Sequence, residues 1–258
     1  MIYAYFILII FFVAITWIEK QNNNIPKKRK QKNPKFCILI PARDESKVIE
    51  ELLKSIQKQT YPIDMKDVYV IVEDKKDKTV KICEKYQTSV FVRKHLELQR
   101  KGYALDECIQ EIWSKNYDAY FIFDADNILD KNYLKEMVKT FEEGYDIGAG
   151  YRNIKNKENV LSVASFLTFS ILNGLGNESK NKDTRNITLS GTGFYIHGKW
   201  IKKWKGYPFH ELTEDYELTL YSILHNMTSY YNKDAIFYDE QPTSLSTSIT
   251  QRKRWIRG

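Results

Sequence analysis

The chain has 258 residues, of which 43% are hydrophobic, 14% aromatic and 28% charged. This length suits one large α/β domain with a sizeable core, and this composition excludes a disordered, collagenous or low-complexity chain. The formal net charge is +7, but six of the cations lie between positions 27 and 35 and four more lie in the last seven residues. The body of the chain, from 36 to 251, therefore carries a net charge of −3, which argues against a nucleic-acid-binding protein.

The first 19 residues predict a membrane anchor. Positions 2–18 carry no charge, and a helix of this length spans roughly 26 Å, close to the thickness of a bilayer's hydrocarbon core. A cleaved signal peptide is the alternative, but no Lys or Arg precedes the apolar stretch and no Ala-x-Ala-like site follows it. The basic linker at 20–34 follows directly, so we expect a single-pass protein of the cell membrane with its main domain in the cytoplasm. The linker also suits contact with anionic lipid headgroups.

The thiol and imidazole side chains give no sign of a metal centre or a disulfide framework. Cys37, Cys83 and Cys108 are scattered and odd in number, and the histidines have no metal-ligand spacing. Free cysteines of this kind are typical of a reducing compartment.

Strand and helix patterns alternate from position 36 to about 143, and one more helix pattern follows at 213–224. Short apolar runs predict buried parallel strands, and apolar residues at helical spacing predict helices. The expected strands are 36–40, 68–72, 90–92 and 120–123, and the expected helices are 48–59, 79–86, 103–113, 133–143 and 213–224. Such alternation is typical of βαβ units, so we expect an α/β fold with a mostly parallel sheet flanked by helices.

Carboxylates follow two of the expected strands, at the end where parallel sheets bind their ligands. Asp74 comes after the strand at 68–72, and Asp124 and Asp126 come directly after the strand at 120–123. Two hard oxygen ligands suit Mg²⁺ or Mn²⁺, which fills its other positions with water and phosphate oxygens. An acidic turn is the simpler interpretation of Asp-Ala-Asp alone, but its place after a buried strand favours a metal site.

Two helix starts carry residues suited to phosphate binding and to proton transfer. Lys101 lies where a helix begins, and a helix N-terminus with a nearby cation suits a diphosphate. Glu214 and Asp215 lie in the first turn of the helix at 213–224, and one of them is a candidate general base. We expect the helix N-terminus to lower the pKa of Asp215. Ordinary solvated helix starts are the alternative in both places.

The last motif, Gln251-Arg252-Lys253-Arg254-Trp255, sets an aromatic residue among cations. Such a patch suits a membrane surface, phosphates, or a sugar ring stacked on Trp255. A basic juxtamembrane tail is the alternative.

Seven short motifs together carry a resemblance to a known family. In chain order they read PARDE, VED, RKGYAL, DAD, SGTGF, TED and QRKRW. This order resembles the membrane-bound family-2 glycosyltransferases, which include the cellulose, chitin and hyaluronan synthases and the bacterial poly-N-acetylglucosamine synthases. The resemblance covers about 35–258 and implies a nucleotide-sugar-binding fold of the GT-A type. It also implies an inverting transfer that depends on Mg²⁺ or Mn²⁺, with a catalytic domain at 35–240 and a C-terminal segment at 241–258.

The resemblance implies a role for each matched residue. Asp74 would contact the nucleoside, and Lys101 the donor phosphates. Asp124 and Asp126 would form the metal and diphosphate site, and Asp215 would be the base. The residues at the acceptor and diphosphate end would be Glu214, Gln251, Arg254 and Trp255. The implied partners are a nucleotide-sugar donor, a saccharide or lipid-linked acceptor, membrane lipids and other membrane subunits.

The sequence departs from the family pattern at three places. Lys75 and Lys76 follow the VED motif where relatives have Gly and Ser, and Tyr221 stands where many relatives have Arg. The sequence also stops directly after QRKRW, where polymer-extruding relatives continue into further membrane helices, so we expect a truncated or a non-processive form. Two other classes stay open, a sugar-phosphate nucleotidyltransferase and a catalytically inactive partner of a polysaccharide synthase.

Overall fold

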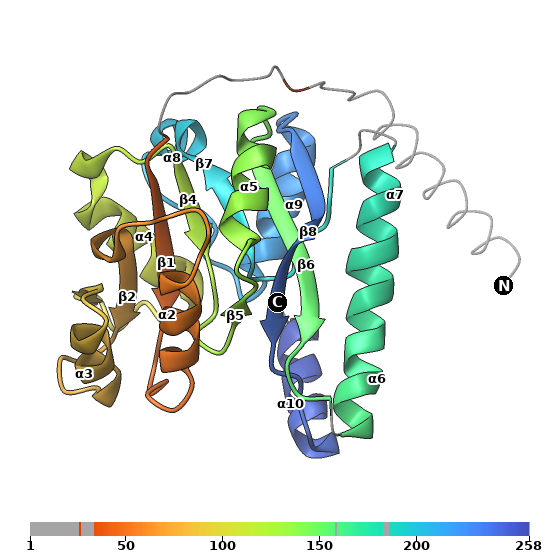
Figure 1. Cartoon of the computed structure of the whole chain (residues 1–258), viewed down its shortest axis with the longest axis horizontal. Coiled ribbons are helices and arrows are strands. Elements are labelled where there is room, and N and C mark those ends of the chain that lie inside the picture. Colours follow the sequence, from red (N-terminus) through yellow and green to blue (C-terminus); the bar gives the residue numbers. More distant parts are fainter. Residues whose placement is uncertain (1–25, 27–33, 158, 183–185, 258) are drawn as a thin grey trace, which may run out of the picture.

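One mixed sheet organises the protein, whose computed structural model describes residue 26 and residues 34–157, 159–182 and 186–257. Eight strands are paired in the order β3-β2-β1-β4-β7-β6-β8-β5 (Figure 1). The first four strands in the chain are parallel to one another, and β6 is parallel to β8. The strand β7 runs antiparallel to β4 and β6, and β5 runs antiparallel to β8. The strands are β1 (Phe36–Pro41), β2 (Val68–Val72), β3 (Ser89–Val92), β4 (Ala119–Ile122), β5 (Ile128–Leu129), β6 (Ile147–Ile154), β7 (Phe194–His197) and β8 (Ser229–Asp239).

Helices cover both faces of this sheet (Figure 1). The α-helices are α2 (Ile49–Gln57), α3 (Lys78–Lys85), α4 (Lys101–Glu111), α5 (Tyr133–Glu142), α6 (Val160–Phe169), α7 (Gly176–Lys182), α8 (Gly198–Trp204), α9 (Glu214–Leu224) and α10 (Leu245–Arg257). The shorter helices are η1 (Met65–Asp67), η2 (Trp113–Lys115) and the π-helix η3 (Ser170–Leu175).

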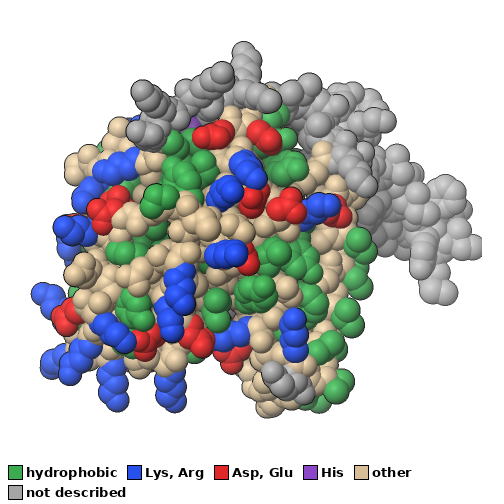
Figure 2. Space-filling model, in the orientation of Figure 1, with side chains coloured by type: hydrophobic (Ala, Val, Ile, Leu, Met, Phe, Trp, Pro, Cys, Tyr) green, Lys and Arg blue, Asp and Glu red, His purple; other side chains and the backbone are tan. Residues whose placement is uncertain are grey.

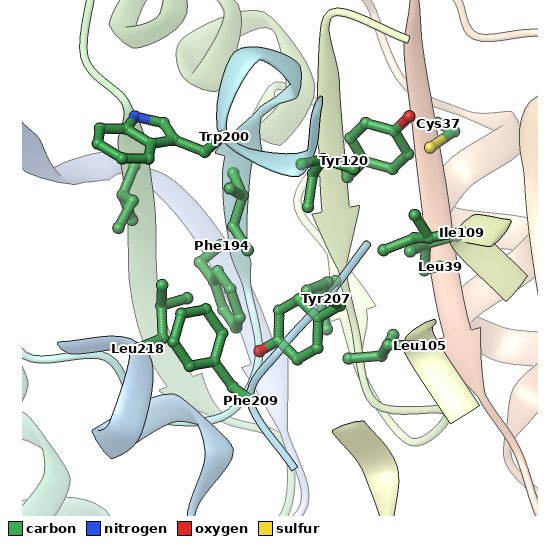
Figure 3. Packing of buried hydrophobic residues seen from close by; sticks show 14 of the residues in the cluster. Cys37, Leu39, Leu105, Ile109, Tyr120, Phe194, Trp200, Tyr207, Phe209 and Leu218 are labelled. Carbon is green, nitrogen blue, oxygen red and sulfur yellow. The ribbon is translucent and has the colours of Figure 1, made fainter. Parts of the chain in front are cut away.

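Alternation along β1 divides the core into two layers, because successive strand residues point to opposite faces of a sheet. Cys37 and Leu39 belong to the layer with α4, α8 and α9, whereas Ile38 and Ile40 belong to the layer with α2 and α5. All four side chains have no exposed surface, and burying each Leu or Ile contributes about 1.5–3 kcal/mol. Figure 3 shows the first layer, where the ring of Tyr207 lies between the sheet and the helices. Both faces of β1 are thus buried.

The fold agrees with the sequence in the parts that alternate most clearly. Every element expected between 36 and 143, and the helix expected at 213–224, occurs with its ends within two residues of the expected ones. The sheet is mostly parallel, as expected, although β7 and β5 are antiparallel additions. The sequence did not predict the elements β5, β6, α6, η3, α7, β7, α8, β8 and α10.

The expected membrane span at 2–18 lies outside the described residues. Among the residues that are described, no helix is long and apolar enough to cross a bilayer.

Candidate active site

The carboxyl ends of β1, β2 and β4 meet at one edge of the sheet, where their arrowheads point the same way (Figure 1). Asp124 follows β4 at this edge. Because β7 is antiparallel to β4, the residues before β7 reach the same edge, and they include Gly191 and Thr192. The start of α4 and the start of α9 complete the site with Lys101 and Glu214.

Lys101 is the centre of this group of side chains. Its Nζ lies 2.5 Å from Oδ1 of Asp124 and donates to the carbonyl oxygen of Gly191 at 2.6 Å. Oε1 of Glu214 lies 3.7 Å from the same ammonium. The side chain of Lys101 is 20% exposed and that of Glu214 is 8% exposed, so the charges interact away from bulk water. One cation therefore links three segments that are far apart in the sequence.

The two acids at the start of α9 are both harder to ionise than usual. Burial raises the pKa of Glu214 from 4.5 to about 7, although Lys101 opposes the shift. Burial also raises the pKa of Asp215, and the hydrogen bond from the backbone N–H of Tyr216 opposes this. The expectation that the helix N-terminus lowers the pKa of Asp215 is wrong, because the loss of hydration outweighs the helix dipole.

Asp215 faces the glycine loop before β7. Gly191 has a φ of +80°, which favours glycine, and a Cβ at this position would lie 3.6 Å from Oδ2 of Asp215. The loop that bonds to Lys101 is therefore also the neighbour of the expected base.

Asp126 lies deeper than Asp124 and is surrounded by negative charge. Burial, together with the carboxylates of Asp239 and Asp124, raises the pKa of Asp126 to about 7. Asp239, the last residue of β8, is 2% exposed and is held by Arg152, whose Nε donates to Oδ2 at 3.0 Å. Nε2 of Gln241 donates to the same oxygen at 2.7 Å. The network puts a buried ion pair directly behind the Asp-Ala-Asp turn.

Sequence reasoning missed this supporting network. Asn127 has no exposed surface and donates to Oδ1 of both Asp126 and Asp239, at 3.2 and 2.8 Å. Thr192 accepts from the backbone N–H of Asp124 at 2.9 Å. Asn127 directly follows the acidic motif and Thr192 lies inside SGTGF. The sequence signal that could have identified both residues is therefore their position beside or within a family motif. Arg152 and Asp239 had no comparable signal, because their strands were not predicted.

The carboxylates fit a divalent cation in their chemistry. Asp124 and Asp126 offer hard oxygen ligands, and the side chain of Asp124 is 43% exposed, which leaves room for further ligands. Within the described residues, no three His, Cys, Asp or Glu side chains form a group that could hold a metal ion. Two protein ligands fit Mg²⁺ or Mn²⁺, which takes its other ligands from water and substrate phosphates.

The remaining expected site residues lie elsewhere or are described only in part. Asp74 is exposed after β2, where Oδ1 accepts from the backbone N–H of Lys76 at 2.9 Å. Gln251 is partly buried in α10. Arg254 and Trp255 belong to α10, but their side chains lie outside the described part of the chain. The structure therefore brings together Lys101, Asp124, Asp126, Glu214 and Asp215. The roles expected of Asp74, Gln251, Arg254 and Trp255 stay predictions.

The departure at Tyr221 has a packing role. Its ring lies 5.4 Å from that of Trp204 and 5.4 Å from that of Phe209, both in edge contacts, and it stacks on His225. These contacts fix α9 against α8, so an aromatic side chain holds the helix that carries the site acids. Aromatic pairs of this kind contribute about 0.5–1.5 kcal/mol beyond their buried area.

Comparison with known proteins gives relatives for nearly the whole chain. It is 28% identical over 252 residues to the probable glycosyltransferase YdaM of Bacillus subtilis (strain 168), covering 91% of this chain and 58% of YdaM. The chain thus spans little more than half of that relative. The TarS 1–349 structure of S. aureus in complex with UDP-GlcNAc has a TM-score of 0.57 and 19% identity, covering 83% of this chain and 60% of that one. The mannosyltransferase PcManGT of Pyrobaculum calidifontis, in complex with GDP-Man and Mn²⁺, has a TM-score of 0.62 and 14% identity, covering 93% and 68%.

These structural likenesses show a GT-A-like fold. Residues 34–258, most of the chain, also match the family described as "Glycosyltransferase like family 2". The match begins just before β1 and includes the site edge, α9 and α10. The chain belongs to glycosyltransferase family 2.

Proposed function

We propose that the chain is an inverting, metal-dependent glycosyltransferase that moves a sugar from a UDP-sugar to a saccharide or lipid-linked acceptor. The observation that carries the proposal is the contact of Lys101 with Asp124 and Glu214, beside Asp215, at the carboxyl edge of the sheet. Membership of glycosyltransferase family 2 supports the reaction class. The complexes of TarS with UDP and with UDP-GlcNAc support uridine as the nucleoside of the donor.

The residues divide the chemistry between binding and proton transfer. Asp124 and Asp126 would hold Mg²⁺ or Mn²⁺, which supplies positive charge to the departing diphosphate. Lys101 binds the donor phosphates with its ammonium group. Asp215 takes the proton from the acceptor hydroxyl. At the same time the hydroxyl oxygen bonds to the anomeric carbon of the donor sugar, and the bond from that carbon to the diphosphate breaks. Attack opposite the leaving group inverts the anomeric configuration.

Glu214 has a different task from Asp215 in this proposal. Its side chain is nearly buried and faces Lys101, so it orients the ammonium group toward the phosphates. The C-terminal residues Gln251, Arg254 and Trp255 belong to the acceptor end, and Asp74 contacts the nucleoside. These four assignments follow the family resemblance.

The test is a transfer assay with the whole chain in detergent or lipid. UDP release is measured with a panel of UDP-hexoses and UDP-N-acetylhexosamines, with GDP-mannose as a comparison, in Mn²⁺, Mg²⁺ and EDTA. We expect release with at least one UDP-sugar and only with a divalent cation, and mass spectrometry of the product then identifies the sugar and linkage. Pyrophosphate release from a nucleoside triphosphate and a sugar phosphate would instead show a nucleotidyltransferase. Turnover of no donor by a folded chain would favour the inactive-partner alternative.

We also propose that the domain works at the cytoplasmic face of the membrane. One flank, seen at the right of Figure 2 over α6, carries exposed apolar side chains. Val160, Leu167, Ile171 and Leu175 on α6 and η3 are 86%, 54%, 58% and 68% exposed. Neither positions 159–177 nor 241–257 contain an acidic residue, and segments without acids that expose apolar side chains suit anionic lipid.

Protease added to intact cells tests this location. The domain should stay whole until the cells are opened, because the basic linker retains it inside. Digestion from outside would overturn the proposed orientation.

A further inference from the structure

The side-chain amide of Asn127 makes four hydrogen bonds behind the Asp-Ala-Asp turn. Oδ1 accepts from the backbone N–H of Asp124 at 3.2 Å and from the hydroxyl of Thr192 at 2.5 Å. Nδ2 donates to Oδ1 of Asp126 at 3.2 Å and to Oδ1 of Asp239 at 2.8 Å. An amide side chain has two donors and two acceptor positions, so each of them has a partner here. With no exposed surface, Asn127 has no water to replace a lost bond.

These bonds join the two carboxylates of the proposed metal site to the rest of the fold. One side of the amide fixes the backbone at Asp124 against the loop before β7, and the other fixes the Asp126 carboxylate. Thr192, 2% exposed, accepts from the same N–H of Asp124. The spacing of the two carboxylates therefore depends on one side chain that cannot itself reach the substrate.

The amide also lies between two acids, the partly buried Asp126 and the buried Asp239. Asp126 and Asp239 repel each other, and Arg152 pairs with Asp239 through its Nε at 3.0 Å and through Nη2. The NH₂ group of the amide donates one hydrogen bond to each carboxylate, which offsets part of the repulsion without adding a charge. A carboxylate or an apolar side chain at this position would leave Asp126 free to turn away.

We propose that Asn127 is a positioning residue that sets the spacing of Asp124 and Asp126 for a divalent cation bound with the donor diphosphate. This inference rests on the metal dependence in the proposed function. Residues that hold metal ligands in place typically change metal affinity by about 10- to 100-fold when they are replaced. We expect replacement of Asn127 to weaken metal-dependent binding within this range.

The experiment compares Asn127→Ala with Asn177→Ala. Asn177 is 1% exposed and bonds through its amide to both the N–H and the carbonyl of Thr188, each at 2.9 Å, so it is a buried asparagine of matched kind outside the site. UDP affinity of the whole chain is measured by titration calorimetry in Mn²⁺ and in EDTA, and thermal unfolding is measured in EDTA. Asn127→Ala should weaken binding about 10- to 100-fold in Mn²⁺ and less than about threefold in EDTA. Asn177→Ala should lower the unfolding temperature but leave the ratio of the two affinities unchanged.

A second pair of variants covers the case in which Asn127→Ala does not fold. Thr192→Val removes the hydroxyl that bonds to Asn127 and Asp124, while Thr192→Ser keeps it. The Val variant should lose Mn²⁺-dependent affinity and the Ser variant should retain it.

Three results would overturn the inference. Equal loss of the Mn²⁺-to-EDTA ratio in Asn127→Ala and Asn177→Ala would show general loosening of the fold. An unchanged ratio in Asn127→Ala, with a parent chain that binds UDP more tightly in Mn²⁺, would reject Asn127 alone and leave the proposed function standing. A parent chain with equal affinity in Mn²⁺ and EDTA would reject the metal dependence and this inference together.

Discussion

Nζ of Lys101 lies 2.5 Å from Oδ1 of Asp124, and the same ammonium lies 3.7 Å from Oε1 of Glu214. A residue at the start of α4 thus neutralises one acid after β4 and another at the start of α9. Since both acids come from different segments, the ammonium group contributes to the fold as well as to donor binding. Removing it leaves two carboxylates near each other with no cation between them.

Lys101→Met keeps the length of the side chain and removes its charge. We expect the free energy of unfolding to fall by about 3 kcal/mol at pH 8, because removal of one partner leaves a partly buried charge uncompensated. The loss should be smaller at pH 5.5, where Glu214, with its pKa of about 7, is protonated. Urea unfolding at the two pH values measures this. The control is Lys94→Met, whose pair with Glu111 is exposed on both sides and should contribute less than about 1 kcal/mol.

Donor binding by Lys101→Met gives a separate result. The affinity for UDP in Mn²⁺ should fall about 10- to 150-fold, since a hydrogen bond to a charged group contributes about 1.5–3 kcal/mol. Unchanged UDP affinity in a folded variant would remove Lys101 from the donor site.

The raised pKa of Glu214 predicts how stability depends on pH. The folded chain keeps a proton on Glu214 up to about pH 7, whereas the unfolded chain releases it near 4.5. The free energy of unfolding that this proton contributes is fully present below pH 4.5. It is lost as the pH rises through 7, by at most about 1.4 kcal/mol per pH unit. Glu214→Gln carries no such proton, so its stability relative to the parent should improve between pH 5 and pH 8.

Chemical unfolding of both chains in EDTA across this range measures the difference. Glu211→Gln is the matched control, because the Glu211 side chain is 62% exposed and pairs with Arg100 at the surface. Its stability relative to the parent should stay nearly flat. A flat difference for Glu214→Gln as well would contradict the burial argument.

Asp215→Asn separates proton transfer from donor binding. The amide keeps the size of the side chain but cannot accept the proton of the acceptor hydroxyl, so transfer should fall about 10²- to 10⁴-fold. UDP affinity should stay within about threefold of the parent, whereas Asp124→Ala and Asp126→Ala should weaken both binding and transfer. Radiolabelled donor measures transfer, and calorimetry measures binding. Near-normal transfer by Asp215→Asn would move the base to Glu214.

The sequence predicted the site residues that follow continuous apolar strands or begin clearly patterned helices. The runs at β1, β2 and β4 are continuous and buried, so Asp74, Asp124 and Asp126 could be placed at their ends before the structure was known. It did not predict β6, whose glycines lower its apolar signal. A Cβ at Gly148 would lie 2.3 Å from the ring of Tyr195, and one at Gly150 would lie 2.5 Å from the carbonyl oxygen of Ala235. Close packing thus requires glycine at these two positions, and the same glycines remove the apolar pattern by which the strand could have been predicted.

The buried network behind the site could not be predicted for the same reason. Arg152 comes from β6 and Asp239 from the end of β8, and their pairing depends on the parallel register of these strands after an irregularity at Gly150/Tyr151. The direction of the pKa shift of Asp215 could not be predicted for a different reason. The helix start was read correctly, but burial is a property of the packed fold, and it reverses the shift that the helix dipole alone predicts.

The close approach of α4 to the segment before α9 gives a final prediction. A Cβ at Gly102 would lie 1.9 Å from the carbonyl oxygen of Phe209, so an alanine forces the backbone of one segment to move. Overpacking of this kind typically costs about 1–3 kcal/mol, and here it also displaces Lys101, the preceding residue. Gly102→Ala should therefore lower both the unfolding temperature and the UDP affinity.

Gly176→Ala provides the matched comparison on another helix. Its added Cβ would meet only the carbonyl oxygen of Ile171, at 3.7 Å, which is ordinary contact. Since alanine favours a helix over glycine by about 1 kcal/mol, this variant should be as stable as the parent or more so. Differential scanning calorimetry of the two variants decides the point. Equal unfolding temperatures for Gly102→Ala and the parent would show that α4 does not pack against the Phe209 backbone as closely as described.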